Sequence, residues 1–146
     1  LLGEVRLSAV CAPTLLSRLD LRNRERKLSA VTLLHEDDGG EWAKWSVAAR
    51  IGLEGNTHVR VNSVAQAIAS AIQGRGVALV SDVLTRNALN EGRLIQPFPT
   101  TINAAREYYI VSPVERVGEP ILRALADRLI EHLHPGATRA SRERET

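Results

Sequence analysis

The sequence predicts an α/β fold with a mainly parallel sheet flanked by helices, and residues 60–81 carry most of that prediction. They read as a short strand, a helix that opens on the capping box Ser63-Val-Ala-Gln66, and a strand over 77–80 that is apolar at every position. Gly74 stands where the helix would end in the left-handed conformation. This order forms a β-α-β unit, whose two strands run parallel. Helical and strand patterns alternate along the rest of the chain, which favours the same fold class.

The segments before this unit alternate in the same way. Strands are expected at residues 5–11, 31–34 and 58–61. Pro13 suits the first turn of a short helix, because its missing N–H costs nothing there. Asp38 and Glu41 have capping-box spacing, which starts a second helix at about Gly39. The basic segment 21–27 is expected to be a solvated loop, because neither an aromatic residue nor a glycine-rich loop accompanies its charges.

The segments after the unit continue the pattern to the last helix. Strands are expected at residues 94–95 and 106–112, and helices at 82–91 and 119–133. Ser81 is placed to cap the first of these helices. The second has the clearest amphipathic stripe in the chain, formed by Ile121, Leu122, Leu125, Leu129, Ile130 and Leu133. Residues 135–146 contain no large apolar side chain and are expected to be disordered.

The composition excludes several classes of protein. A chain of 146 residues with 44% hydrophobic content can form one domain with a substantial core. Only 3% of the residues are aromatic, which argues against base stacking on single-stranded nucleic acid, and a net charge of +2 is too small to indicate a phosphate-binding surface. No run reaches the roughly 18 to 20 apolar residues of a membrane span. The single cysteine, Cys11, fits a reducing compartment, the cytoplasm. Because the chain begins at Leu1 and lacks methionine, we expect it to be a piece of a longer protein.

In open α/β sheets, ligands bind beyond the carboxyl ends of the strands, near helix N-termini. Three such corners are expected in this chain: Cys11-Ala12, His35-Glu36-Asp37 and Asn62-Ser63. At Ser63 a hydroxyl stands beside the free amides of a helix start, a combination that suits a carboxylate or another anion. The alternative is an ordinary cap that stabilises the helix by about 1 kcal/mol and binds nothing.

Enzymatic and metal chemistry find little support in the residues. His35, Glu36 and Asp37 are consecutive and do not converge easily on one ion, and neither a His-x-x-x-His nor a Cys-x-x-Cys pair accompanies them. A nucleophile at Cys11 would need a histidine close in space, and nothing in the sequence assigns His35 or His58 to that role. Glycine-rich phosphate loops are absent from the sequence. We therefore expect no catalytic residue, no metal and no cofactor.

Four stretches of the chain carry a resemblance to a known family. They are LSAVCAPTLLSRL (7–19), LLHEDDGGEWAKW (33–45), VNSVAQAIASAIQGRGVALVSDVL (61–84), and EGRLIQPF with REYYIVSP (91–113). In this order and spacing they resemble the effector-binding domain of LysR-type transcriptional regulators. Within that family they are most similar to the subgroup that regulates glycine cleavage and inducible β-lactamase, because paired leucines precede a Trp-x-x-Trp. The likeness covers about residues 4–134.

The resemblance implies a fold like that of the type 2 periplasmic binding proteins, in which two α/β subdomains are joined by two crossover strands. Residues 12–105 would form the second subdomain, 5–11 and 106–113 the crossovers, and 119–133 a helix that packs on the first subdomain. Most of the first subdomain and the winged helix-turn-helix of the family are expected to be missing from this fragment. Contacts with DNA would then need the missing domain, and the intact protein would assemble into a dimer or tetramer.

The resemblance also implies a ligand-sensing function. A small-molecule effector, such as an amino acid or a small carboxylate, would bind in the cleft between the subdomains and control DNA binding. The residues expected to face that cleft are Ser63, Asn62, His35, Glu36, Asp37, Cys11 and Ala12, with Trp42 and Tyr108 further out. Ser63 would donate to an anionic group of the effector, and His35 would add a second polar contact. The alternatives are a solute-binding protein of a transporter with the same fold and a small α/β enzyme, and no membrane partner is expected.

Overall fold

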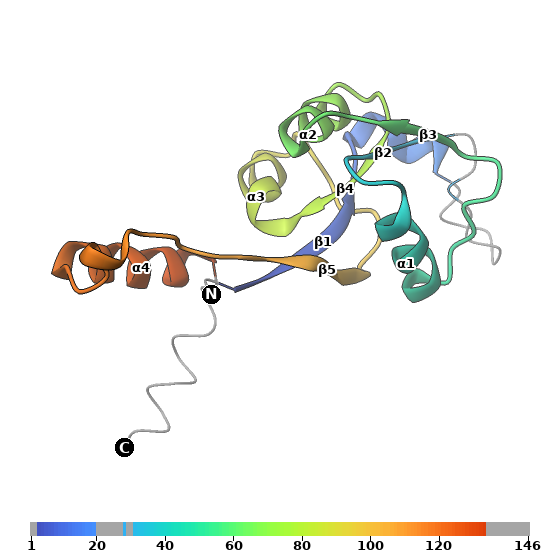
Figure 1. Ribbon diagram of the computed structural model, residues 1–146. Helices are drawn as coiled ribbons and strands as arrows, with labels where there is room; N and C mark the ends of the chain where they lie inside the picture. Colours follow the sequence, from blue (N-terminus) through green and yellow to red (C-terminus); the bar gives the residue numbers. More distant parts are fainter. Residues whose placement is uncertain (1–2, 20–27, 29–30, 134–146) are drawn as a thin grey trace, which may run out of the picture. The chain divides into compact units, whose positions relative to one another are not determined.

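A computed structural model of the chain describes residues 3–19, 28 and 31–133 (Figure 1). The elements in chain order are β1 (Gly3–Val10), the 3-10 helix η1 (Pro13–Arg18), β2 (Thr32–His35), α1 (Gly40–Ala49), β3 (Thr57–Arg60), α2 (Val64–Ile72), β4 (Val77–Ser81), α3 (Asp82–Asn90), β5 (Thr101–Tyr108), the 3-10 turn η2 (Val114–Arg116) and α4 (Pro120–Leu133). The predicted α/β class is confirmed. The segments 21–27 and 135–146, predicted to be a solvated loop and a disordered tail, lie outside the described residues.

The five strands form one sheet in the order β3-β2-β4-β1-β5. β2 pairs in parallel with both β3 and β4, whereas β1 runs antiparallel to β4. The sheet is therefore mixed, and the prediction of a mainly parallel sheet holds for its β3-β2-β4 part. β3 lies on one side of β2 and β4 lies on the other. The connections from β2 to β3 and from β3 to β4 therefore run across the sheet in opposite directions. Because both crossovers are expected to be right-handed, α1 and α2 lie on opposite faces of the sheet.

The hydrophobic core fills both faces. The cluster beneath α2 and α3 consists of Val10, Leu34, Val61, Ala67, Ala71, Ala78, Val80, Ala88 and Leu94. Leu33, next to Leu34 on β2, is fully buried as well, and neighbouring strand residues point to opposite faces. Every residue of β4 is buried, as its uninterrupted apolar run predicted. The core thus fixes β2, the strand that leads into the first polar corner.

Two local predictions near the central helix are confirmed. Gly74 follows α2 in the left-handed conformation, with φ of 73°, and its N–H donates to the Ala71 carbonyl at 3.0 Å. Ser63 is the N-cap of α2, and its hydroxyl oxygen accepts from the Gln66 N–H at 3.2 Å. The other half of the capping box differs slightly, because Oε1 of the Gln66 side chain accepts from the N–H of Asn62 rather than from that of Ser63.

Two element predictions need correction. The expected strand at 106–112 is instead β5 (Thr101–Tyr108), five residues earlier, because pairing within the sheet decides where a strand forms more than the β-branched and aromatic side chains do. Ile95 makes only an isolated bridge with Cys11 instead of belonging to a strand. The short helix predicted to begin at Pro13 is confirmed and is the 3-10 helix η1.

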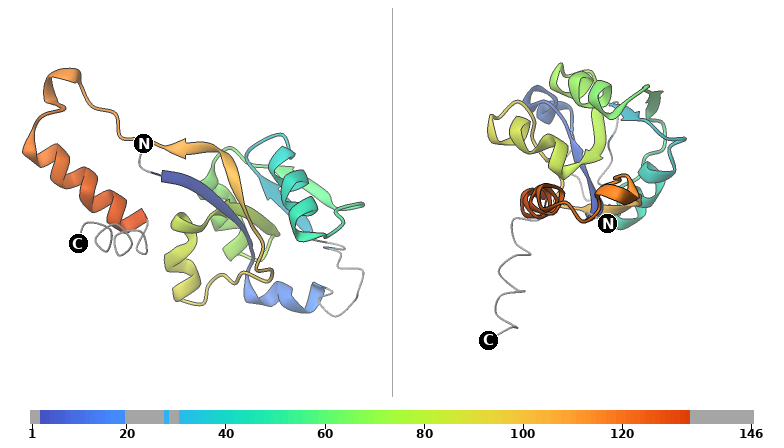
Figure 2. Two further views of the ribbon diagram at one scale, coloured as in Figure 1. Left: turned by 90° about the horizontal axis from the view of Figure 1, so that it is seen from below. Right: turned by 60° about the vertical axis from the view of Figure 1, so that its left-hand side comes forward.

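The chain divides into two compact units. One comprises Arg6–Ala104, and the other comprises Leu1–Val5 together with Ala105–Thr146. The polar corners at His35 and Ser63 both belong to the first unit. The second unit contains α4 (Figure 2). No residue of α4 is buried.

Candidate functional site

Two of the predicted corners lie at the same edge of the sheet. β2 and β3 are parallel neighbours, and their register places His35 opposite Arg60 at the carboxyl end of each strand. The Val61 N–H donates to the His35 carbonyl oxygen at 2.8 Å, which ties the two strand ends together. Ser63 follows two residues later, at the start of α2. The turn after His35 and the start of α2 therefore leave adjacent strands at one edge, as the sequence predicted.

The start of α2 offers donors to an anion. The Ser63 side chain is partly exposed and that of Asn62 is exposed. The Ser63 hydroxyl oxygen accepts from the Gln66 N–H, so the hydroxyl hydrogen is free to point elsewhere. The first amides of any α-helix lack partners within the helix, and the helix dipole makes this end partly positive. Hydroxyl, amides and dipole all favour a negatively charged group at this position.

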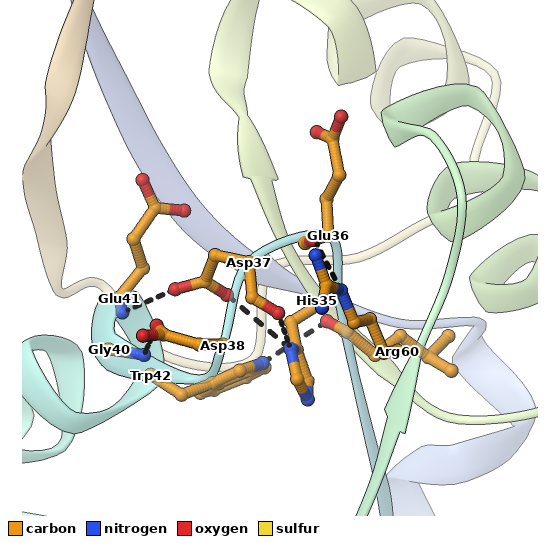
Figure 3. A network of polar contacts seen from close by, with 9 residues as sticks. His35, Glu36, Asp37, Asp38, Gly40, Glu41, Trp42 and Arg60 are labelled. Carbon is orange, nitrogen blue, oxygen red and sulfur yellow. Dashed lines mark hydrogen bonds and ion pairs between the residues drawn. The ribbon is translucent and has the colours of Figure 1, made fainter.

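The turn between β2 and α1 is held by its own side chains (Figure 3). Nδ1 of His35 lies 2.8 Å from the backbone oxygen of Asp37, so the geometry assigns the proton to Nδ1. The Asp37 carboxylate accepts from the Glu41 N–H at 2.9 Å, and that of Asp38 accepts from the Gly40 N–H at 3.0 Å. The sequence predicted that Asp38 and Glu41 would form a capping box at this helix start. Instead, Asp37 and Asp38 satisfy the amides of the first turn.

The charge state of Asp37 follows from these contacts. Burial raises the pKa of its carboxyl group, but hydrogen bonds from the backbone of Glu41 and Gly39, together with the charge of His35, outweigh that effect and leave the pKa below its ordinary value. Oδ1 of Asp37 lies 3.4 Å from Nδ1 of His35. The carboxylate is thus stabilised in its ionised form by the turn itself.

The buried side chain of His35 stabilises this edge of the sheet. Its side chain is buried, and its ring makes an edge-on contact with the ring of His58, at 5.5 Å between centroids. Its Nε2 is buried and has no hydrogen-bond partner. Because Nδ1 donates to the backbone oxygen of Asp37, the imidazole ring mainly stabilises the turn between β2 and α1. Figure 3 shows the Glu36 side chain pointing away from this contact.

Arg60 is a residue of this edge that the sequence analysis missed. Its side chain is exposed, and its Nε donates to the backbone oxygen of Glu36 at 3.2 Å (Figure 3). This contact holds a guanidinium group beside the turn, two residues before Asn62. Only the β2–β3 register, in which Arg60 pairs with His35, identifies it. From the sequence alone, an arginine that ends an exposed strand carries no such signal.

The remaining predicted site residues do not join this edge. Because β1 is antiparallel to β4 and Val10 pairs with Ala78 near the start of β4, the chain leaves β1 toward the opposite edge of the sheet. Cys11 and Ala12 are buried there, and burial raises the pKa of the Cys11 thiol to about 11. In the mainly parallel sheet that the sequence predicted, this corner would lie beside the other two, but the antiparallel direction of β1 places it at the opposite edge.

Two aromatic residues were also expected near the site. Trp42 lies in the core, fully buried, and its indole N–H donates to the Leu34 carbonyl oxygen at 3.1 Å. Its ring packs edge-on against that of Trp45, at 5.4 Å between centroids, so Trp42 supports the β2–α1 connection from inside. Tyr108 ends β5, is partly buried, and belongs to the unit that contains α4.

The described residues contain neither a metal cluster nor a membrane-spanning helix. Among residues 3–19, 28 and 31–133, there is no group of three or more histidine, cysteine, aspartate or glutamate side chains placed to hold a metal ion. No helix in this part of the chain is both long enough and apolar enough to cross a bilayer. The β2–β3 edge offers charge and hydrogen bonds to a ligand.

Comparison with known proteins places these features in a family context. Residues 1–134 match the family model described as the LysR substrate binding domain. The chain is 34% identical over 115 residues to the HTH-type transcriptional activator AmpR of Rhodobacter capsulatus, covering 79% of this chain and 38% of that protein. It is 29% identical over 111 residues to the glycine cleavage system transcriptional activator of Escherichia coli K12, covering 72% and 35%. The chain thus spans little more than a third of the length of these relatives.

A solved structure shows the same fold. The AmpR effector binding domain from Citrobacter freundii superimposes with a TM-score of 0.71 at 25% sequence identity, covering 92% of this chain and 66% of that one.

Proposed function

Because this chain belongs to the LysR substrate binding domain family, we propose that it is the ligand-sensing module of a bacterial LysR-type transcriptional regulator and binds a small-molecule effector at the β2–β3 edge. The family consists of effector-binding domains and not of enzymes. The two relatives described above are transcriptional activators, which favours a regulator over a transporter's solute-binding protein. The observation that carries the proposal is the convergence of the Ser63-capped helix start and the His35 turn at one sheet edge.

Ser63 is the primary contact in this proposal. Its hydroxyl and the first amides of α2 would receive an anionic group of the effector, with Asn62 beside them. Arg60 adds a positive charge at the same edge. His35 and Asp37 act by fixing the turn that presents Glu36, so His35 has a positioning role rather than the direct polar contact that the sequence suggested. An amino acid or a small carboxylate fits this set of donors.

The proposed division of the chain follows the family's architecture. Residues 12–105 form the second subdomain, which carries this edge, and the segments 5–11 and 106–113, which contain most of β1 and the last residues of β5, cross to the first subdomain. In the intact regulator, the helix over 119–133 packs on the first subdomain, and Tyr108 at the end of β5 contacts the effector. DNA binding belongs to a winged helix-turn-helix elsewhere in the intact protein, which acts in the cytoplasm as a dimer or tetramer.

Regulation requires that the effector bind two conformations with different affinity. A ligand that bound both arrangements of the two subdomains equally well would leave the ratio of the two arrangements unchanged, however tightly it bound. A group anchored at Ser63 in one subdomain can discriminate between them only if the rest of the effector contacts the other subdomain. We therefore expect the edge described here to supply one half of the binding contacts.

The test uses two substitutions at Ser63 in the intact regulator. A panel of amino acids and small mono- and dicarboxylates is first screened by thermal shift, and the ligand that binds is titrated calorimetrically. Ser63→Ala removes the hydroxyl, whereas Ser63→Asp keeps a good helix cap and places a negative charge where the effector's anionic group would lie. We expect a roughly ten- to hundredfold weaker affinity for Ser63→Ala, since one hydrogen bond to a charged group contributes about 1.5 to 3 kcal/mol, and a larger loss for Ser63→Asp.

Stability distinguishes a binding effect from a folding effect in this test. Ser63→Asp should unfold at nearly the same urea concentration as the natural protein, because aspartate caps helices as well as serine does. Unchanged affinity in both variants would show that the effector's anionic group lies elsewhere, and the site assignment would fall. If no ligand in the panel bound the natural protein, the proposal that the effector is an amino acid or small carboxylate would be wrong.

A further inference from the structure

Helix α1 connects the turn after β2 to the segment that leads into β5. At its start, the carboxylates of Asp37 and Asp38 accept from the first amides of the helix, at 2.9 and 3.0 Å. The turn and the helix are therefore joined by side chains as well as by the backbone. Because a helix moves largely as one rigid element, a displacement of the turn carries the start of α1 with it.

Two tryptophans continue this connection along the buried face of α1. Trp42 and Trp45 are both fully buried, and their rings meet edge-on at 5.4 Å between centroids. The indole N–H of Trp42 donates to the Leu34 carbonyl oxygen at 3.1 Å, which holds the helix against β2. Rings packed as closely as this cannot shift independently of each other. A tilt of α1 about Trp42 therefore moves Trp45, which lies about 4.5 Å further along the helix.

Trp45 contacts the segment that immediately precedes β5. Its indole N–H donates to the Thr100 carbonyl oxygen at 3.0 Å, and its ring packs edge-on against that of Phe98, at 5.5 Å between centroids. Residues 96–100 belong to neither a helix nor a strand, so side-chain contacts of this kind help to position them. β5 begins at the next residue, and after Ala104 the chain passes into the second compact unit. The whole series of contacts, from the turn to Thr100, lies within the first unit.

We propose that this series of contacts transmits effector binding from the turn between β2 and α1 to the start of β5, and that Trp45 is the positioning residue at its far end. An effector bound beside Glu36 displaces the turn, tilts α1 and shifts Thr100. Because β5 leads out of the first unit, a shift at its start changes the path of the chain toward the rest of the protein. This transmission rests on the function proposed above for the source of the displacement, whereas the contacts themselves can be tested without an effector.

The first experiment measures amide hydrogen exchange in the 146-residue chain. Asp37→Ala removes a carboxylate that holds the start of α1, and it should speed exchange at residues 100–104 several-fold. Ser63→Ala is the matched control, because it removes the corresponding cap from α2, which packs on β2 and β4, and it should not speed exchange there. In Trp45→Phe, which lacks the N–H bonded to Thr100, Asp37→Ala should have no further effect on these amides. Urea midpoints show how much of any change comes from lower global stability.

The second experiment adds an effector to the intact regulator. The probe is the amino acid or carboxylate that gives the largest thermal shift in the panel described above. Its binding should change exchange at residues 100–104 in the natural regulator but not in Trp45→Phe. Its calorimetric affinity should be nearly the same in both proteins, because Trp45 does not contact the proposed site. A purely structural role for Trp45 would lower stability without abolishing the response of these amides.

Three results would overturn this role of Trp45. The first is exchange at residues 100–104 that Asp37→Ala speeds no more than Ser63→Ala does. The second is an effect of Asp37→Ala on these amides that persists in full in Trp45→Phe. The third is an equal response to the probe in the natural regulator and in Trp45→Phe. If no member of the panel bound, the effector class proposed above would be wrong, and the first experiment would still decide the role of Trp45.

Discussion

Replacing Gly76 with alanine tests the close approach of β2 and β4 on which the site's position depends. An added Cβ would lie 2.5 Å from the backbone oxygen of Thr32 and 3.2 Å from Cγ of Leu34. Ordinary Cβ contacts begin at 3.4 Å, so the strands would have to separate locally by about 0.9 Å (3.4 − 2.5). The atom at 2.5 Å belongs to the main chain of β2, and no change of side-chain rotamer can relieve that contact.

The cost follows from the kind of atom that must move. Overpacking of a well-packed interior costs about 1 to 3 kcal/mol, and a weakened backbone hydrogen bond between β2 and β4 adds about 1 kcal/mol. We therefore expect Gly76→Ala to lower the free energy of unfolding by about 2 to 4 kcal/mol. Because native domains are stable by only about 5 to 15 kcal/mol, this is a large share of the total.

Urea unfolding followed by tryptophan fluorescence measures this loss. Trp42 and Trp45 are both fully buried on α1, in the same compact unit as Gly76. Gly52→Ala is the matched control, because its added Cβ would meet the Glu54 carboxylate, the end of a flexible and exposed side chain that can swing away. If Gly76→Ala costs no more than Gly52→Ala, the reasoning about the β2–β4 approach is wrong.

Three further predictions concern single side chains. The pKa of the Asp37 carboxyl group is lowered in the folded protein. Its contribution to stability is therefore present above the ordinary pKa of 3.8 and is lost as the pH falls through the lowered pKa. Between about pH 5 and about pH 3, the urea midpoint of Asp37→Asn should therefore fall less than that of the natural protein. Trp45→Phe keeps an aromatic ring but loses the N–H that donates to the Thr100 carbonyl oxygen at 3.0 Å, which should cost about 1 to 2 kcal/mol in the same assay. Burial raises the pKa of Cys11 to about 11, so a thiol reagent at pH 8 should label it only as fast as the unit opens, and labelling at the rate of the denatured chain would contradict its burial.

Local patterns identified a large part of the fold. The capping box at Ser63, the left-handed Gly74 and the buried strand that became β4 all depend on side chains within a few residues of each other. Their energies are set by hydrogen bonds and burial that neighbouring residues bring about. The amphipathic stripe of α4 was also predicted from local spacing, although no local pattern indicates what covers it.

Errors arose where distant segments pair. The strand expected at 106–112 formed as β5 at Thr101–Tyr108, because strand position follows the partner strand. At the start of α1, Asp37 joins Asp38 in accepting the first amides, an arrangement that the capping-box spacing of Asp38 and Glu41 did not predict.

The sequence by itself determined the α/β class, the helices and the polar residues that follow β2 and β3, because periodicity and capping act over short distances. Only the tertiary structure decided that β1 runs antiparallel, which takes Cys11 to the opposite edge of the sheet, and that Arg60 lies opposite His35. Strand direction and register depend on hydrogen bonds between segments far apart in the chain. Those bonds form only when both faces of the sheet can be buried at once, and no local pattern records that condition.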